Sequence, residues 1–350
     1  MNTERLIEFR RDIHAHPELS NEERQTAAKV HAWLQELNIF HSIKEIGDTG
    51  IIAEYDSGKE GPHILLRAEL DALPIEEINN FEYRSSKKHI SHMCGHDGHL
   101  TSLLGVALGL TMDELKKGKL SLLFQPGEEN GTGAKAVLND ENVSFGPFDY
   151  VIAYHNLPGY PRHSIVVKDD SFTAHVVSVI IQLNGKTSHA AEPELGFNPG
   201  MAVSDILALG DLMNNNDPGR SDFFLVTPVH INMGDIAYGI SAGHAEIHLT
   251  LRAWTKKMLK KKAYKLMHAI EEKAALHHID CSYDWTHEFF ANKNDAHVVE
   301  TIREVARAHS FELIERKMPF KWGEDFGLFT QHYKGAMFGI GSGEDHPALH

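Results

Sequence analysis

The sequence predicts an α/β protein in which a mostly parallel sheet forms the larger domain and a smaller α+β domain is inserted into it. The 350 residues exceed the length at which a single hydrophobic core usually stops growing. Strand-like and helical segments alternate through the first half of the chain and return near its end, which is typical of a parallel sheet. The middle shows the order β-α-β-β-α-β. We therefore expect one domain at residues 1–172 and 289–350, with an insertion at residues 173–288.

The elements of the larger domain follow from the spacing of apolar residues. Pro17 separates two helices with helical apolar spacing, because proline and the residue before it disfavour a helix. Before the insertion we expect helices at 4–14, 22–37 and 98–112 and strands at 50–55, 63–67, 120–124 and 150–154. After it, a helix at 295–310 and a strand at 336–340 should return to the same sheet.

The insertion has the element order of a ferredoxin-like domain, the split βαβ arrangement. Its predicted strands are 176–183, 223–233, 245–253 and 281–288, and its predicted helices are 198–213 and 256–276. The second helix is rich in lysine and alanine.

Composition narrows the class of protein. The formal charge of −15 argues against nucleic acid or an anionic membrane surface as partner. Cys94 and Cys281 are the only two cysteines, which excludes a disulfide framework and fits a reducing compartment. No apolar run approaches the length of a membrane span, and the charged N-terminus lacks the apolar core of a signal peptide. We therefore expect a cytoplasmic protein.

Polar side chains follow three of the predicted strands at the point where each strand ends. Asp71 comes after the first, Glu128 and Glu129 after the second, and His155 after the third. The carboxyl ends of parallel strands meet at one edge of a sheet, where functional groups gather. The three loops are therefore expected to converge.

The densest group of candidate ligands is Cys94-Gly95-His96-Asp97-Gly98-His99, directly before a predicted helix. Thiolate and imidazole are donors that transition metals bind, and carboxylate suits a harder ion. On an extended segment Cys94 and His96 would point to the same side. A lone cysteine or histidine is usually structural, but this density favours a metal site.

The remaining candidate residues support a functional site only when they are considered together with the Cys94–His99 group. Metal-assisted hydrolysis needs one carboxylate as ligand and one as general base, and Glu128 and Glu129 could divide those roles. Asp71 could bind a metal or orient His96. His189, in the insertion, could stabilise a developing oxyanion, provided that the domains close or a partner subunit supplies it.

The motifs together resemble a known family, the metal-dependent aminoacylase and carboxypeptidase-like amidohydrolases, in the branch with hippurate hydrolases and indole-acetyl-amino-acid hydrolases. The matching segments, which run along nearly the whole chain, are residues 10–19, 67–74, 94–99, 125–129, 185–191 and 323–326. The resemblance implies a zinc-peptidase-like, phosphorylase/hydrolase-like catalytic domain and an inserted dimerisation or lid domain.

The resemblance also implies a two-metal centre for Zn²⁺, Mn²⁺ or Co²⁺. Cys94, His96, Glu129, His155 and His350 resemble the family's ligands, with His346 as the alternative to His350. Glu128 resembles the general base for a metal-activated water that cleaves a small-molecule amide. His189 resembles the residue that reaches the scissile carbonyl from the second subunit of a homodimer joined through the inserted domains.

The sequence departs from the family pattern in four places. Glu69 stands where the family usually has Asp, Thr187-Ser188 replaces a frequent pair of glycines, and the chain stops at His350 where relatives continue. The loop at residues 237–243 replaces an Asn-Val-Ile-Pro segment expected to help bind substrate, for which Arg252 could partly substitute.

Three functions remain compatible with these residues. The first is hydrolysis of an N-acyl amino acid or a similar small amide. The second is a dipeptidase or carboxypeptidase activity with the same machinery. The third is a non-catalytic protein that binds a metal or ligand at a degenerate site. The intact set of ligands and the base at Glu128 favour an enzyme.

Overall fold

A computed structural model describes residues 3–347, and these form two compact units. The second unit comprises Thr173–Ala291 and Met318–Gly323, and the remaining described residues form the first. Residues 289–291 and 318–323 therefore belong with the insertion, although the sequence pattern assigns 289–350 to the larger domain. The reason is local: Phe320 bridges to Thr173, and Met318 packs on a small cluster within the second unit.

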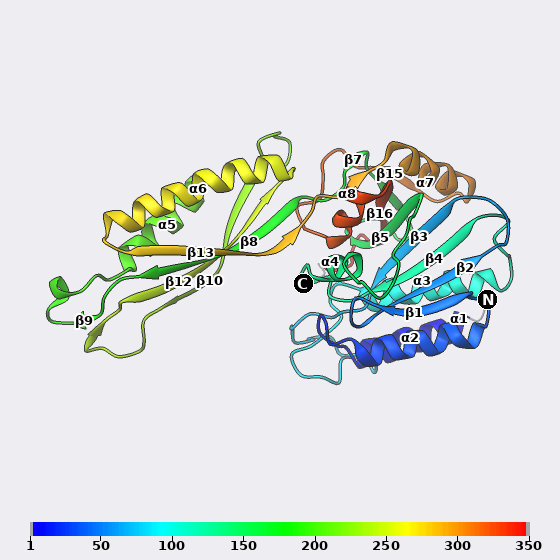
Figure 1. Ribbon diagram of the computed structural model, residues 1–350, viewed down its shortest axis with the longest axis horizontal. Coiled ribbons are helices and arrows are strands. Elements are labelled where there is room, and N and C mark those ends of the chain that lie inside the picture. The colour runs from blue at the N-terminus through cyan, green and yellow to red at the C-terminus, as the bar shows by residue number, and fades with distance from the viewer. Residues whose placement is uncertain (1–2, 348–350) are drawn as a thin grey trace. The chain divides into compact units, whose positions relative to one another are not determined.

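The first unit contains an eight-stranded mixed sheet with the order β1-β2-β4-β3-β5-β16-β6-β15 (Figure 1). Its strands are β1 (Ser42–Ile46), β2 (Gly50–Asp56), β3 (His63–Glu69), β4 (Lys119–Gln125), β5 (Tyr150–Pro158), β6 (Ile165–Val167), β15 (Leu313–Glu315) and β16 (Gly335–Gly343). The neighbours β4, β3, β5 and β16 run parallel, whereas β1, β2 and β6 add antiparallel pairings. The prediction of a mostly parallel sheet is confirmed, with antiparallel additions that it did not include.

Helices and two short strands complete this unit. The helices are α1 (Thr3–Ala15), α2 (Arg24–Leu37), α3 (His96–Leu110), α4 (Gly133–Leu138), α7 (Ala296–Ala308) and α8 (Phe329–His332), with a 3₁₀ turn η2 at Asp325–Leu328. The small strands β7 (Asp170–Ser171) and β14 (Lys293–Asn294) pair separately. None of the helices within residues 3–347 is both long and apolar enough to cross a membrane.

Alternation along β3 decides which side chains meet the helices. Ile64, Leu66 and Ala68 pack in a core with α1, α2 and α3, while α7 covers β6 and β16. Arg67 lies between these apolar positions and points to the opposite face, as the two-residue period of a strand requires. It is fully buried there, beside Phe326 of η2.

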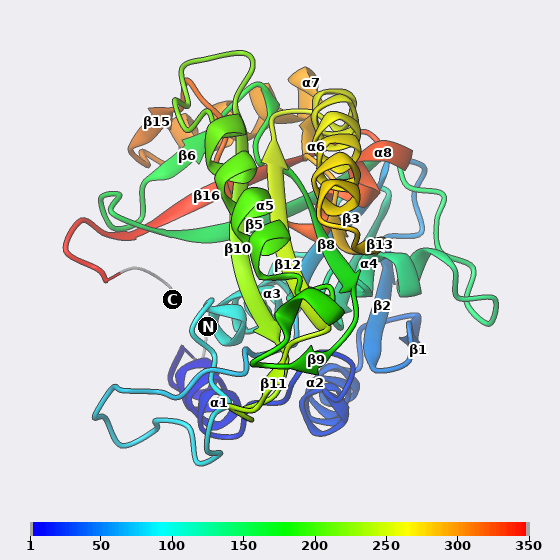
Figure 2. The same ribbon diagram turned by 90° about the vertical axis from the view of Figure 1, so that its left-hand side faces the viewer.

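The second unit is an antiparallel sheet of order β10-β12-β8-β13 with two helices on one face (Figures 1 and 2). Its elements are β8 (His175–Asn184), β9 (Ser188–His189), η1 (Pro193–Leu195), α5 (Gly200–Met213), β10 (Phe224–Met233), β11 (Ile240–Ser241), β12 (His244–Ala253), α6 (Lys256–Leu276) and β13 (Asp280–Phe289). The major elements follow the ferredoxin-like order predicted from the sequence.

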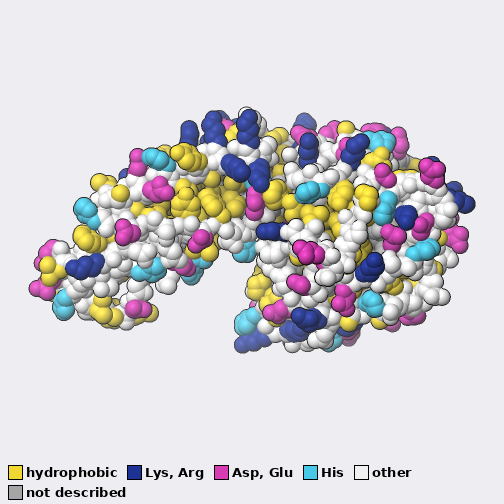
Figure 3. All heavy atoms as spheres, viewed as in Figure 1, with side chains coloured by type: hydrophobic (Ala, Val, Ile, Leu, Met, Phe, Trp, Pro, Cys, Tyr) yellow, Lys and Arg dark blue, Asp and Glu magenta, His cyan; other side chains and the backbone are white. Residues whose placement is uncertain are grey.

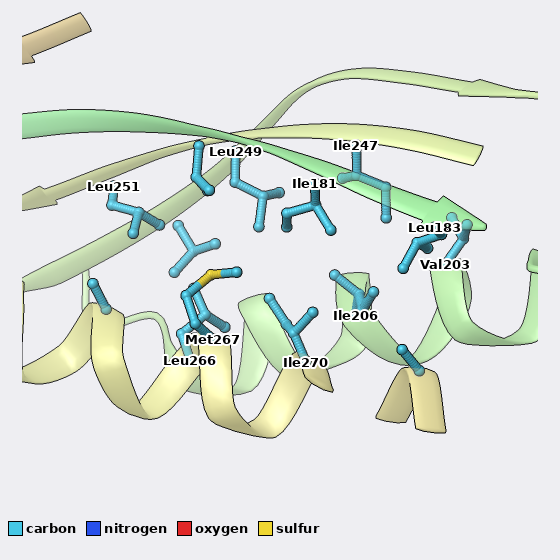
Figure 4. Packing of buried hydrophobic residues seen from close by; sticks show 14 of the residues in the cluster. Ile181, Leu183, Val203, Ile206, Ile247, Leu249, Leu251, Leu266, Met267 and Ile270 are labelled. Carbon is cyan, nitrogen blue, oxygen red and sulfur yellow. The ribbon is translucent and has the colours of Figure 1, made fainter. Parts of the chain in front are cut away.

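The core of this unit lies between the sheet and the two helices. Ile181 and Leu249 point from the strands toward Leu266 and Ile270 of α6 and Ile206 of α5 (Figure 4). All five are at most 1% exposed. Alternate residues of β8 and β12 supply the strand side of the core, which explains why their sequences alternate in polarity.

Candidate metal centre

Three adjacent parallel strands bring the candidate residues to one edge of the sheet. Asp71 follows β3, and Glu128 and Glu129 lie in the loop after β4. His155 comes from β5, which continues to Pro158. The expectation that His155 follows the strand is therefore wrong by three residues, because pairing with β16 extends β5 beyond the apolar run that marked it.

The Cys94–His96 segment is a tight turn, so the prediction of an extended segment is wrong. Gly95 has φ of +93°, and His96 is already the first residue of α3. A Cβ on Gly95 would lie 2.8 Å from the side-chain amide of Asn156, so the close approach requires glycine. The tight turn, rather than strand alternation, brings Cys94 and His96 to the same site.

The donors of five side chains converge there. Cys94 Sγ lies 3.4 Å from His155 Nε2. His96 Nε2 lies 3.8 Å from Glu129 Oε1 and 3.9 Å from Glu128 Oε2. Within each of the groups Cys94–His96–His155 and His96–Glu128–Glu129, one ligand atom per residue lies within 4.8 Å of the others. Thiolate, imidazole and carboxylate together suit divalent transition metals.

Backbone carbonyls fix how the two imidazoles face this cluster. His96 Nδ1 lies 2.9 Å from the Asp71 carbonyl oxygen, and His155 Nδ1 lies 2.8 Å from the Asn156 carbonyl oxygen. A carbonyl oxygen only accepts, so each Nδ1 carries the proton. In the neutral ring this makes Nε2 the acceptor nitrogen, the atom through which such a histidine binds a metal.

Three buried polar atoms at this place have no hydrogen-bond partner among the described residues. They are His96 Nε2, Glu129 Oε1 and Asp71 Oδ1; the last lies 3.2 Å from His96 Nδ1, whose proton is donated to the Asp71 carbonyl oxygen instead. Buried polar atoms are nearly always paired, because leaving them unpaired is costly. Since two of the three point from proposed ligands into one cluster, the residues present fit a bound cation.

The pKa shifts support the same conclusion. Burial raises the pKa of the Cys94 thiol to about 12 and that of Glu129 to about 7. It also lowers the pKa of His155 to about 3, and together with Glu324 it raises the pKa of Glu128 well above the usual range. Each of these shifts opposes the charged form, as burial does. A divalent cation would reverse this for the thiol and the carboxylates.

A second buried cluster lies behind Glu128. The guanidinium of Arg67 forms ion pairs with Glu69, with Glu324 at 3.0 Å and with Asp325 at 2.5 Å. Asp325 also donates its backbone N–H to Glu128 Oε1 at 3.2 Å. Burial disfavours the charged guanidinium, but the surrounding carboxylates more than offset this and raise the pKa of Arg67. The general-base candidate is thus held by a network centred on one buried cation.

Sequence reasoning missed this network and the role of His99. His99 Nδ1 lies 2.7 Å from Glu69 Oε2, and its Nε2 lies 2.9 Å from Asn156 Oδ1. These contacts tie the end of β3 to β5 beside Gly95. One signal was available: Arg67 interrupts an apolar strand, and a charge in a buried strand needs partners.

Two other candidates belong to the second unit. His189 is exposed in β9, which pairs with β11 so that His189 opposes Ile240. Arg252 is half-buried in β12 and donates from Nη1 to the Lys321 carbonyl oxygen at 3.0 Å. Burial lowers the pKa of Arg252.

The last candidate ligand, His350, lies outside the described residues. Its alternative, His346, is exposed, and its Nδ1 lies 2.8 Å from the Pro347 carbonyl oxygen.

Comparison with known proteins gives matches along the whole chain. Residues 65–350 match the profile of Peptidase family M20/M25/M40. The chain is 33% identical to the N-acetyl-L-cysteine deacetylase of Bacillus subtilis, over 99% of this chain and 82% of that protein. It is 34% identical to the hippurate hydrolase of Campylobacter jejuni, over 93% of this chain and 85% of that protein.

Among solved structures, the YXEP protein of Bacillus subtilis superposes with a TM-score of 0.79 at 28% identity. The match covers 97% of this chain and 88% of that one, which is described as a dinuclear metal-binding peptidase of the M20 family.

Proposed function

Because the chain belongs to Peptidase family M20/M25/M40 and is an amidohydrolase of that family, we propose that it hydrolyses the amide bond of an N-acyl amino acid or a similar small amide. The observation that carries the proposal is the approach of Glu128 and Glu129 to the same nitrogen, His96 Nε2. A ligand and a base on consecutive residues are what metal-assisted hydrolysis needs. The names of the two relatives above, a deacetylase and a hippurate hydrolase, support this substrate class.

We assign the reaction to the larger domain, predicted at residues 1–172 and 289–350, apart from the short segments 289–291 and 318–323 that belong with the second unit. We assign a dimerisation or lid role to the insertion, predicted at residues 173–288. All of the converging donors lie in the first unit. The second unit instead has an edge strand, β13, and an exposed Tyr264 on α6, which suit association.

Two divalent ions would be held by Cys94, His96, Glu129 and His155, with His350 as the fifth ligand. Bound there, the ions would act as Lewis acids that polarise the scissile carbonyl and acidify water. The mixed donor set is compatible with Zn²⁺, Mn²⁺ or Co²⁺. A cytoplasmic location would keep the Cys94 thiol reduced.

A side chain of the protein then transfers the proton from water to the leaving amine. Glu128 takes a proton from the attacking water, whose oxygen forms a bond to the acyl carbon. The C–N bond breaks as Glu128 returns the proton to the departing amine. The Asp325 N–H holds one oxygen of Glu128, so the other, Oε2, is left to face the cluster. Asp71 keeps the His96 ring oriented from its backbone oxygen.

We assign His189 to stabilise the oxyanion from the inserted domain of a second subunit, and Arg252 to the carboxylate of the substrate. A neutral or charged imidazole can donate to the developing charge. The exposure of His189 in β9 is compatible with such a role.

The test uses purified protein with Mn²⁺, Zn²⁺ or Co²⁺ and three substrate sets: N-acetyl amino acids, hippurate and dipeptides. We expect turnover of the acylated amino acids and about two metal ions per chain. Glu128→Gln should abolish turnover while metal stays bound, whereas Glu60→Gln, at an exposed glutamate, should behave as wild type.

The same assay separates the alternatives. Preference for dipeptides would replace the proposed substrate class by a dipeptidase or carboxypeptidase. An activity that survives Glu128→Gln would refute the mechanism. A protein that binds no metal at neutral pH and turns over none of these substrates would be a non-catalytic relative.

We also propose a homodimer through the inserted domain. A groove of about 450 Å³ lies between α6 and β13, and Leu259, Met267 and Val177 line its apolar part. Figure 3 shows hydrophobic side chains gathered along this region. β13 is one of the two edge strands of its sheet, and Trp285 on it is 46% exposed. An exposed edge strand beside an apolar groove favours pairing with another chain.

The charges on α6 favour a second copy as the partner. Lys260, Tyr264, His268 and Glu271 line the groove from one face of the helix. In an antiparallel two-fold contact, Lys260 of one copy would face Glu271 of the other, and Tyr264 would face His268. The helix is therefore complementary to itself in this orientation.

Charge exchange tests this interface. Lys260→Glu and Glu271→Lys should each weaken the dimer in light scattering, and the double exchange should restore it, because the pairing is preserved. A wild-type monomer, or a double variant no better than the singles, would refute the proposed interface. For the role of His189, mixed dimers of Glu128→Gln and His189→Ala subunits should regain activity.

A further inference from the structure

The loop that carries Glu128 and Glu129 is folded too tightly to move without consequence. Gly127, at its start, has φ of +57°, and a Cβ there would lie 2.7 Å from Asn21 Oδ1. Gly133, at its end, begins α4, and a Cβ there would lie 1.6 Å from the Pro126 carbonyl oxygen. Both ends of the loop are therefore fixed against their surroundings.

Three buried carboxylates from separate parts of the chain accept the backbone N–H groups of this loop and of the residue after it. Glu23 Oε1 accepts from Gly127 at 2.8 Å, Asp71 Oδ2 accepts from Glu129 at 2.9 Å, and Asp325 Oδ2 accepts from Ala134 at 2.8 Å. The three carboxylates are at most 2% exposed. A buried N–H group that lost its acceptor would cost free energy, so each of these bonds holds its part of the loop in place.

Of these three carboxylates, Glu23 is the one to which the proposed site gives no other role. Its remaining contacts are with the backbone N–H of Asn21 at 2.9 Å and with Thr49 Oγ1 at 2.6 Å. It is completely buried, and burying a carboxylate costs free energy unless its hydrogen bonds repay the loss of water. The bond that reaches furthest along the chain is the one to Gly127.

We propose that Glu23 is a positioning residue which, with Asp71 and Asp325, fixes the backbone that carries Glu128 and Glu129. The inference rests on the proposed function, in which these two glutamates are base and ligand. Without Glu23, the start of the loop loses its anchor, and both carboxylates shift relative to His96. Small displacements of reacting groups reduce the rate far more than they reduce substrate binding.

Glu18 provides a matched control in the same segment. It is a buried glutamate, 6% exposed, and its Oε2 accepts from the backbone N–H and the hydroxyl of Thr26 in α2. These side-chain hydrogen bonds stay within the N-terminal region, while its backbone oxygen, which the substitution does not change, accepts from the Ala72 N–H at 2.8 Å. Glu18→Gln should therefore lower thermal stability without affecting the loop.

The experiment compares Glu23→Ala, Glu23→Gln and Glu18→Gln in the full-length, metal-loaded protein. For Glu23→Ala we expect kcat to fall about 10- to 100-fold, as for other residues that orient ligands, with KM within about twofold. Glu23→Gln can keep the shape of the contact without its charge, so its loss should be smaller. Glu18→Gln should keep kcat even where its melting temperature falls.

Hydrogen exchange measures how well the loop is held in place, independently of catalytic turnover. In Glu23→Ala, backbone amides in the segment 127–132 should exchange about 10- to 100-fold faster than in wild type, with or without metal. If Glu23→Ala does not fold, Glu23→Gln carries the same test. Unchanged exchange in that segment, or a kcat loss matched by Glu18→Gln, would overturn the positioning role. A protein with no amidase activity but with faster exchange in Glu23→Ala would refute the proposed function alone.

Discussion

Replacing Arg67 with methionine should destabilise the first unit strongly, and more so at higher pH. The change removes the one guanidinium that pairs with the buried carboxylates of Glu69, Glu324 and Asp325. Methionine fills similar space without charge. Removing one partner of a buried ion pair costs about 3–5 kcal/mol, because the other partner stays buried and unpaired. That is a large part of a total stability of about 5–15 kcal/mol.

The expected pH dependence comes from the pKa values of the carboxylates that lose Arg67 as their partner. Although burial opposes it, Arg67 together with His99 holds the pKa of Glu69 well below its usual range in the wild type. Without Arg67, the pKa of Glu69 rises, although His99 still lowers it. The pKa of Asp325, which burial already raises to about 7 against the effect of Arg67, rises further above its unfolded value. A group with a raised pKa is favourable while protonated, and this advantage is lost as the pH rises above the unfolded pKa. For one extra proton bound, the penalty grows by about 1.4 kcal/mol per pH unit.

The assay is urea unfolding of the chelator-treated protein at pH 5, 6, 7 and 8, followed by hydrogen exchange in peptides from β3 and β4. Arg303→Met is the matched control, since Arg303 also pairs with three carboxylates, but those of Asp169, Glu300 and Glu315 are about half exposed or more. It should cost less than about 1 kcal/mol. A pH-independent loss for Arg67→Met, or one no larger than the control's, would refute the reasoning.

Three further predictions concern the two units separately. Gly133→Ala places a Cβ within 1.6 Å of the Pro126 carbonyl oxygen, so metal affinity by calorimetric titration should fall at least about tenfold; wild-type affinity would contradict this. Ile270→Ala in the core of the second unit should cost about 2–5 kcal/mol in urea melts and Ile270→Val only about 0.5–1.5, whereas equal costs would mean that the core refills the space. Burial raises the pKa values of Glu129 and Asp325 to about 7 each. With a chelator present, the free energy of unfolding should therefore fall as the pH rises from about 4.5 to 7, because the folded form keeps protons that the unfolded form releases. Saturating Mn²⁺ should flatten that slope in thermal melts, and a slope unaffected by metal would argue against binding at these carboxylates.

The features that the sequence predicted well are those with local periodicity. The β3 and β4 runs and the amphipathic α2 could be read because burial imposes a period on each segment by itself. The short strands β6 and β15 were missed, since three residues show no period and are stabilised by a neighbouring strand. The left-handed turn at Gly95 was missed because its cause, the Asn156 amide, lies 61 residues beyond in the sequence.

The same limit applies to the site. A dense motif such as Cys94–His99 shows its chemistry at once, because the donors are neighbours in the chain. Glu23 does not, since its partner Gly127 is 104 residues away, and Arg67 and Asp325 are 258 residues apart. In the sequence, a single acidic residue at the start of a helix cannot be told from a solvent-exposed one. Only the fold shows which N–H groups donate hydrogen bonds to it. Positioning residues are therefore harder to predict than ligands.

The site's electrostatics explain why these positioning carboxylates tolerate burial. Around His96 and Glu128 the fold collects more buried carboxylates than Arg67 can neutralise, so several pKa values rise instead. Such an excess would be a defect in a purely structural core, because a hydrophobic replacement would be more stable. It becomes favourable once divalent cations occupy the cluster, since each cation offsets charge that the protein cannot pair by itself. The stability of the first unit is therefore coupled to its metal affinity. Replacing Glu129, a proposed ligand whose pKa burial raises, should stabilise the metal-free form while weakening metal binding.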